Sequence, residues 1–98
     1  NGIGVRRNYS IALKYYQKAA KLGNSEALFN LGSCYEKGEG VRLNYTKAIE
    51  YYEEAANLGN YKAMLNLGSC YKDGKGVHEN ITKATEYFEK ARKLGVKR

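Results

Sequence analysis

The sequence predicts an all-α fold, an α-solenoid of stacked antiparallel helix pairs, and three observations lead to that prediction. Residues 24–59 and 60–95 align without a gap at a period of 36 residues, with 21 of 36 positions identical. Apolar residues recur at helical spacing in each half of this unit, and pairs of glycines separate the two halves. A single helix pair cannot bury its apolar stripe alone, so consecutive units are expected to stack.

The whole chain, residues 1–98, is expected to form one repeat domain, because 98 residues suffice for one small core. Its first 23 residues align with the second half of the next unit, with 13 of 23 positions identical. The expected order is the second half of a repeat at 1–23, full repeats at 24–59 and 60–95, and the start of another repeat at 96–98.

The first helix of each full repeat is expected at 25–37 and 61–73. Asn24 and Asn60 precede these segments, and asparagine is among the best helix N-caps. One apolar stripe, repeated in the second copy, defines the buried side of the helix. Its members in the first copy are Ala27, Leu28, Leu31, Cys34 and Tyr35.

A loop with two glycines should break the chain between the helices of a repeat. In Gly38-Glu39-Gly40-Val41 the glycines suit backbone angles with φ > 0, and the valine offers an apolar anchor. Copies of this loop begin at Gly74 and at Gly2.

The second helices should follow these loops, so that the chain has five helices and no strand. Each should begin after a capping asparagine, Asn8, Asn44 or Asn80. Each should end at a Leu-Gly pair, whose glycine is Gly23, Gly59 or Gly95. The expected ranges of these second helices are 8–22, 45–57 and 81–94.

The same three asparagines begin Asn-x-Ser/Thr triplets, which accept N-glycans in a secretory lumen. We favour the capping role, because the repeat copies one signal and capping accounts for it. The triplets are Asn8-Tyr9-Ser10, Asn44-Tyr45-Thr46 and Asn80-Ile81-Thr82.

The aromatic pairs of the second helices are expected in the core, although exposed aromatic rings beside basic groups can also stack on nucleic-acid bases. Within the first helices, Gly32 and Gly68 should permit close approach of the partner helix at Ala48 and Ala84. The aromatic pairs are Tyr15/Tyr16, Tyr51/Tyr52 and Tyr87/Phe88.

The pattern Ala-x-x-x-Leu-Gly-x-x-Tyr-x-x-Gly-x-Gly-Val, followed by Lys-Ala-x-x-Tyr-Tyr-x-x-Ala-Ala-x-x-Gly, begins at Ala27 and spans a repeat. It resembles the Sel1-like repeat, a branch of the tetratricopeptide superfamily. The next repeat keeps the pattern except at Phe88 and Arg92. The resemblance implies a right-handed solenoid that acts as an adaptor between proteins, with further repeats of the same chain as neighbours.

Cys34 and Cys70 occupy equivalent positions, so they should lie on stacked helices roughly 8–10 Å apart, beyond the ~7 Å limit for a disulfide. Buried free thiols slightly favour a reducing compartment such as the cytoplasm. The glycosylation triplets keep a secretory or endoplasmic-reticulum lumen open as the alternative.

No catalytic, cofactor or metal site is expected, and no enzyme activity. His78 has no cysteine or serine pattern beside it, and the two-glycine loops lack the lysine of phosphate-binding loops. No apolar run approaches the ~20 residues that a membrane-spanning helix needs.

The partner is instead expected in the inner groove, which first helices line in tetratricopeptide arrays. There Asn30 and Asn66 would form a ladder of polar anchors, since an amide offers both a donor and an acceptor. The alternative is solvated asparagines without a ligand. Asn66→Ala should then weaken binding with little loss of stability. The candidate contacts are Glu26, Phe29, Asn30, Ser33, Glu36, Lys37, Lys62, Leu65, Asn66, Ser69, Lys72 and Asp73.

Two functions remain open at this point. The first is a protein-interaction scaffold that binds a peptide or helix, which the lysines of the groove would favour in acidic form. The second is binding of single-stranded RNA, which a net charge of +7 permits. However, the charge runs +5, −3 and +5 over residues 1–23, 24–59 and 60–98. This reversal argues against a continuous phosphate-binding stripe, so nucleic acid is the less favoured partner.

Overall fold

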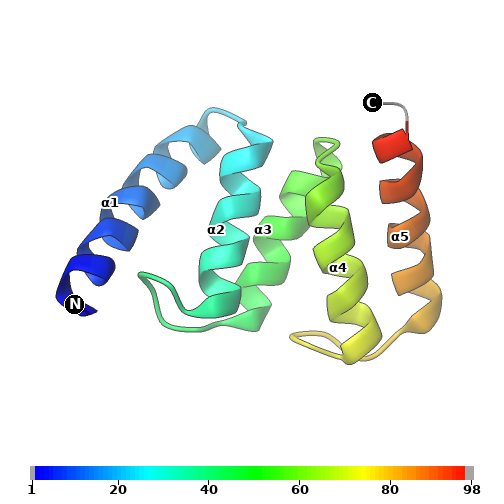
Figure 1. The fold of residues 1–98 in the computed structure, drawn as a ribbon. Coiled ribbons are helices and arrows are strands. Elements are labelled where there is room, and N and C mark those ends of the chain that lie inside the picture. The colour runs from blue at the N-terminus through cyan, green and yellow to red at the C-terminus, as the bar shows by residue number, and fades with distance from the viewer. Residues whose placement is uncertain (1, 97–98) are drawn as a thin grey trace.

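A computed structural model of the chain describes the backbone of residues 2–96 and the side chains of residues 9–95 (Figure 1). Within residues 2–96 every regular element is an α-helix, which confirms the all-α fold with five helices and no strand. The helices are α1 (Gly2–Lys21), α2 (Ser25–Lys37), α3 (Tyr45–Asn57), α4 (Tyr61–Asp73) and α5 (Ile81–Val96).

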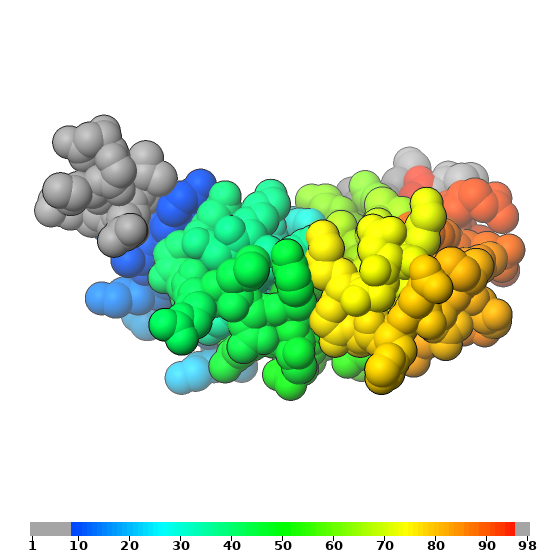
Figure 2. Space-filling view, turned by 90° about the horizontal axis from the view of Figure 1, so that it is seen from below, coloured from blue at the N-terminus to red at the C-terminus, as the bar shows by residue number. Residues whose placement is uncertain are grey.

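The helices stand side by side and alternate in direction along a body of 41 × 28 × 22 Å. Figure 1 shows the Leu-Gly turns along the upper edge of the row and the two-glycine loops along its lower edge. The view in Figure 2 looks onto the loop-bearing end, where residues 38–44 and 74–80 lie next to one another. Each helix packs against its neighbours in sequence, so the chain forms a helical repeat stack.

The predicted asparagine caps are confirmed for the helices α2, α3, α4 and α5. Each side-chain oxygen accepts a 3.0 Å hydrogen bond from the backbone N–H three residues later. Gly38 and Gly74 end α2 and α4 in the left-handed region, with φ of 69° and 68°. The capping residues are Asn24, Asn44, Asn60 and Asn80.

The predicted break at Gly2-Ile3-Gly4-Val5 is wrong, because α1 already begins at Gly2. Asn8 therefore lies inside α1 and does not cap it. In the later loops the left-handed glycine bonds back to the preceding helix, as the Gly38 N–H does to the Cys34 carbonyl. Gly2 and Gly4 both lie in helical backbone, so neither provides the left-handed turn that Gly38 and Gly74 provide.

Helix α5 continues slightly beyond its predicted range of 81–94 and ends at Val96, so Gly95 does not form the predicted turn. Gly23 and Gly59 do turn the chain, with φ of 84° and 90°. In both cases the next residue is an asparagine whose N–H bonds back five residues, at 3.1 and 3.0 Å. Gly95 is followed by valine, which cannot cap a further helix through its side chain.

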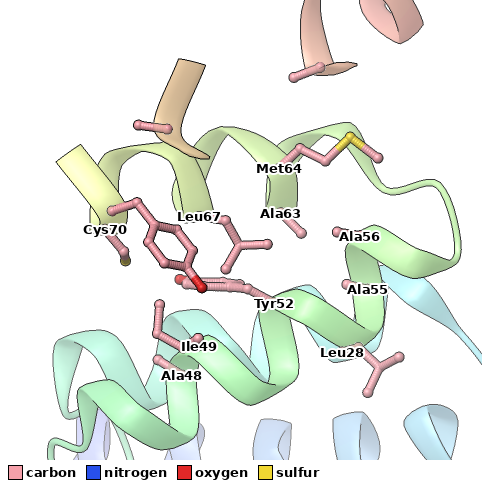
Figure 3. Packing of buried hydrophobic residues seen from close by; sticks show 13 residues of the cluster. Leu28, Ala48, Ile49, Tyr52, Ala55, Ala56, Ala63, Met64, Leu67 and Cys70 are labelled. Carbon is pink, nitrogen blue, oxygen red and sulfur yellow. The ribbon is translucent and has the colours of Figure 1, made fainter. Parts of the chain in front are cut away.

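The core is centred on Tyr52 of α3, which has 0% of its surface exposed. Figure 3 shows Ala63 and Leu67 of α4 pointing toward Tyr52 and Ala55 of α3. These four residues belong to one buried cluster that continues to Ala84 and Ala91 in α5. A smaller cluster, Leu13, Leu31 and Cys34, joins α1 to α2.

The glycines inside the first helices admit an aromatic ring of the second helix, and at Gly32 the predicted Ala48 is close as well. A Cβ at Gly32 would meet the Tyr52 ring at 2.6 Å, with the Ala48 carbonyl oxygen farther away at 3.2 Å. A Cβ at Gly68 would meet the Phe88 ring, also at 2.6 Å. The close approach was therefore correctly predicted, but for Gly68 its partner was not.

Burial of the aromatic pairs is confirmed for the complete repeats, whereas in α1 Tyr16 is half-buried and Tyr15 is exposed. Tyr51 and Tyr87 are half-buried and stack on Tyr35 and Tyr71 of their own first helices. Tyr15, at the equivalent position of α1, is 71% exposed. Among the described residues no aromatic ring stacks on Tyr15, and the periodicity of its own helix could not reveal this.

Candidate partner-binding surface

The predicted contacts come from α2 and α4, and we call the side of these helices that carries them the first-helix face. Phe29, Asn30, Ser33 and Asn66 are half-buried there. Leu65 is 42% exposed, an unusual value for a large apolar side chain on a helix that is otherwise well packed. The remaining predicted contacts are exposed: Glu26, Lys37, Lys62, Ser69, Lys72 and Asp73.

One end of this face is held together by contacts between the two repeats. The Lys62 amine lies 3.0 Å from the Glu26 carboxylate and 5.8 Å from the centre of the Phe29 ring. Asn60 adds hydrogen bonds to the Ser25 carbonyl oxygen at 3.3 Å and to Glu26 at 3.2 Å. The structure thus brings Glu26, Phe29 and Lys62 together as predicted neighbours, and it adds Asn60.

The middle of the face is a polar junction around the Tyr52 hydroxyl. This hydroxyl donates a 2.6 Å hydrogen bond to Glu36, and the Asn66 side chain approaches it from α4. Lys75 approaches the other Glu36 oxygen at 3.7 Å. Burial, reinforced by the bond to Glu36, raises the pKa of Tyr52 well above its ordinary value, so the hydroxyl keeps its proton.

Asn66 therefore lies near a buried hydroxyl, which the sequence did not reveal. No known sequence motif links an acidic residue to a tyrosine sixteen residues later. Glu36 and Tyr52 therefore meet only because α2 and α3 pack together. Asn66→Ala is consequently expected to cost stability as well as any binding contact.

Asn30 occupies the equivalent position on α2 but lies beside an open cavity of about 290 Å³. Near the same cavity the Tyr9 hydroxyl donates a 3.1 Å hydrogen bond to Glu39. The two asparagines of the predicted ladder thus differ, one in an open site and the other in a closed junction. The cavity is lined by Tyr9, Ala12, Tyr16, Asn30, Ser33, Cys34 and Glu39.

The charges of the face reverse sign from one repeat to the next. Where α2 has Glu26, Glu36 and Lys37, α4 has Lys62, Lys72 and Asp73. The first of these reversals creates the ion pair between the repeats. Over two repeats the face presents acidic groups beside basic ones rather than a uniform field.

The cysteines are buried and unlinked, as predicted. Burial raises the pKa of both thiols, that of Cys70 to about 11, so both are protonated at neutral pH. Within the described part of the chain no three His, Cys, Asp or Glu side chains are placed to hold a metal ion. Nor is any described helix long and apolar enough to cross a membrane.

Sequence comparison matches the Sel1 repeat three times, over residues 1–24, 25–60 and 62–96. The chain belongs to the Sel1 repeat family. Proteins of this family generally act as scaffolds for protein–protein interaction. A comparison with curated proteins gave no match.

Solved Sel1 repeat structures share the fold. A Sel1 repeat protein from Oxalobacter formigenes is 36% identical over 88% of this chain and 35% of its own, with a TM-score of 0.83. The protective antigen c5321 of uropathogenic Escherichia coli, which has the same fold, is 32% identical over 89% of this chain and 19% of its own, with a TM-score of 0.85. Helicobacter pylori cysteine-rich protein B is 37% identical over 85% and 62%, with a TM-score of 0.81. The chain therefore spans less than two thirds of each relative.

Proposed function

We propose that this Sel1 repeat chain is a non-catalytic scaffold that binds a segment of another protein on its first-helix face. The observation that carries the proposal is the row formed by positions 29, 30 and 33 of α2 and their equivalents 65, 66 and 69 of α4. Each triplet offers one apolar side chain, one amide and one hydroxyl, one repeat apart. An extended peptide or a helix could meet the same chemistry twice along its length.

The exposed leucine of this row supports contact with an apolar side chain. Leu65 is 42% exposed, while Phe29 at the equivalent position packs against Tyr52 with ring centres 5.8 Å apart. Burying the exposed part of a leucine is worth roughly 1–2 kcal/mol, which is a useful share of a moderate affinity.

The charges of the face favour a partner with separated charges over a uniformly acidic one. Glu26 and Glu36 are engaged by Lys62 and Lys75. Lys37 and Lys72 remain exposed and can meet carboxylates of the partner, while Asp73 can meet a lysine or arginine.

The proposal can be tested with a random-peptide display library selected against the protein. Selected peptides should lose at least tenfold in affinity for Leu65→Glu, because the substitution places a charge where an apolar side chain is buried. Leu58→Glu is the matched control, since Leu58 is a 55% exposed leucine at the turn between α3 and α4. Peptides that respond to Leu58→Glu and not to Leu65→Glu would place binding outside the first-helix face.

The same selection can be made with single-stranded RNA. If generic RNA binds more tightly than any selected peptide, with an affinity that falls steeply as salt rises, the chain is a nucleic-acid-binding protein and the proposal is wrong.

A further inference from the structure

A groove of about 470 Å³ lies between the second helices α1 and α3, and we call it the second-helix groove. Both helices pack on α2 rather than on each other, so they form two walls with α2 as the floor (Figure 1). Every residue that lines the groove belongs to one of these three helices: Gln17, Ala20, Lys21, Leu28, Leu31, Tyr51 and Glu54.

The floor of the groove is apolar and well packed. Leu28 and Leu31 are buried, with 4% and 1% of their surface exposed, and Ala20 of α1 is half-buried beside them. Tyr51 is a fixed part of the α3 wall, because its ring stacks on Tyr35 with ring centres 5.7 Å apart. The groove therefore offers apolar surface on a rigid support, which lowers the entropic cost of binding.

The two walls carry opposite charges that have no partner within the described chain. Lys21 stands on the α1 wall and Glu54 on the α3 wall, and both side chains are exposed. Neither forms an ion pair with a described residue. A ligand in the groove would therefore meet a positive charge along one edge and a negative charge along the other.

The equivalent place in the next repeat, between α3 and α5 over α4, is filled differently. Met64 replaces a leucine in its floor, and the wall alanine, Ala56, is buried. Lys90 stands where α3 has a glutamate, and its amine lies 5.9 Å from the centre of the Tyr87 ring. There the wall alanine is covered and the wall charge is engaged, whereas both remain available in the second-helix groove.

The chemistry of the groove favours a helix over an extended peptide. An extended backbone needs hydrogen-bond partners along its length, yet the Gln17 amide and the Tyr51 hydroxyl are the only uncharged polar side-chain groups in the lining. A helix satisfies its own backbone and presents only side chains to its neighbours. Charged residues at the edges of its apolar stripe would face the two walls, as they do in coiled coils.

We infer that the second-helix groove binds an amphipathic helix of another protein, with acidic residues along the edge that faces Lys21 and basic residues along the edge that faces Glu54. The apolar stripe of this helix lies over Ala20 and the Tyr51 ring. The site is separate from the first-helix face and does not depend on the function proposed for that face.

The test selects displayed helical peptides against the full 98-residue chain. The peptides have about 18 residues on an alanine-based scaffold, long enough to form a helix. Their apolar stripe is randomised, and each edge of the stripe carries either glutamate or lysine. The chain carries Leu65→Glu, so that peptides which bind the first-helix face are not selected. Peptides with glutamate along one edge and lysine along the other should dominate the selection.

Charge reversal on one wall tests whether these peptides lie in the groove. Lys21→Glu and Glu54→Lys should each weaken binding of the mixed peptides roughly three- to tenfold, because an attraction becomes a repulsion. In Lys21→Glu both walls are acidic, so peptides with lysine along both edges should become the tightest binders. In Glu54→Lys the preference should change to glutamate along both edges.

Lys93→Glu and Glu89→Lys are the matched controls, because they make the same changes in net charge at exposed residues of α5 outside the groove. Both should keep the preference for mixed edges. The inference is overturned if no peptide is selected, or if Lys93→Glu changes the preferred edges as Lys21→Glu does. It is also overturned if the unmodified chain is a dimer that Glu54→Lys converts into a monomer, because the occupant is then a second copy.

Discussion

The two full repeats have the same backbone but differ in the chemistry at their centres. In the first, Tyr52 is completely buried and its hydroxyl is bonded to Glu36, with Asn66 near it. In the second, Phe88 is half-buried and has no hydroxyl, and Lys72 occupies the position equivalent to Glu36. Both rings nevertheless lie 2.6 Å from where the Cβ of a first-helix residue would be. The ring and the glycine therefore set the spacing of the helices, and the polar groups around them are free to vary.

The largest expected effect is the loss of stability when the Tyr52 ring is removed, compared with removal of the Phe88 ring. Tyr52→Ala should destabilise the chain by roughly 3–5 kcal/mol, because it opens a cavity in the core and leaves Glu36 and Asn66 without their partner. Phe88→Ala should cost less, since that ring is partly exposed and can be replaced by water. Urea denaturation followed by circular dichroism measures both, and equal losses would contradict the comparison.

The next largest effects on stability are expected at Gly32 and Gly68, the glycines that contact these two rings. Gly32→Ala forces a methyl group into the buried Tyr52 ring and should cost roughly 1–3 kcal/mol. Gly68→Ala should cost less, because Phe88 has room to move toward solvent. Gly95→Ala is the matched control: no atom lies within 4 Å of its Cβ position. There, alanine should stabilise the helix by up to about 1 kcal/mol, and destabilisation by this variant would contradict the packing argument.

The buried acids predict a loss of stability at alkaline pH. Burial raises the pKa of Tyr52, and it raises that of Cys70 from 9.0 to about 11. Because the folded chain holds these protons more tightly than the unfolded chain, the stabilisation is complete below about pH 9 and is lost as the pH rises. Thermal melts between pH 8 and about 11 should show this decline. Cys70→Ala should make the decline shallower, and an unchanged pH profile would exclude the thiol as a cause.

The smallest effect is expected at the surface contact between the repeats. The Glu26–Lys62 pair is about half exposed at both side chains, so Lys62→Ala should cost only about 0.2–1 kcal/mol and less at high salt. Lys72→Ala is the matched control, because this exposed lysine of the same helix forms no ion pair with a described residue. If both variants have the same effect at low salt, the ion pair contributes nothing.

Most of the fold followed from the sequence because the repeat supplies the same local signal several times. The asparagine caps, the left-handed glycines at 38 and 74, and the buried cysteines are local features with one physical explanation each. At Gly2 and Gly95 the repeat alignment predicts a turn, but the backbone at both positions is helical.

The candidate surface was less predictable, because its chemistry depends on pairs of helices. Repeat periodicity placed Asn30 and Asn66 on equivalent positions, yet Asn30 lies beside an open cavity and Asn66 lies near the buried Tyr52 hydroxyl. Asn60 was predicted as a cap, and nothing in the sequence indicated that its amide also reaches α2. Such contacts join residues about one repeat apart and follow from no single helical pattern.

The central claim is that the Tyr52 hydroxyl and the Glu36 carboxylate stabilise the repeat as a pair, so that one can be replaced without large loss only if the other is replaced too. A double-mutant cycle tests it by converting the first full repeat to the chemistry of the second, with Tyr52→Phe, Glu36→Lys and the two combined. Each single change leaves a buried polar group or a charge without its partner, so the combined variant should be more stable than the sum of the two losses predicts, by roughly 0.5–3 kcal/mol. Losses that simply add, with a coupling energy near zero, would show that Tyr52 and Glu36 contribute independently and would contradict the claim.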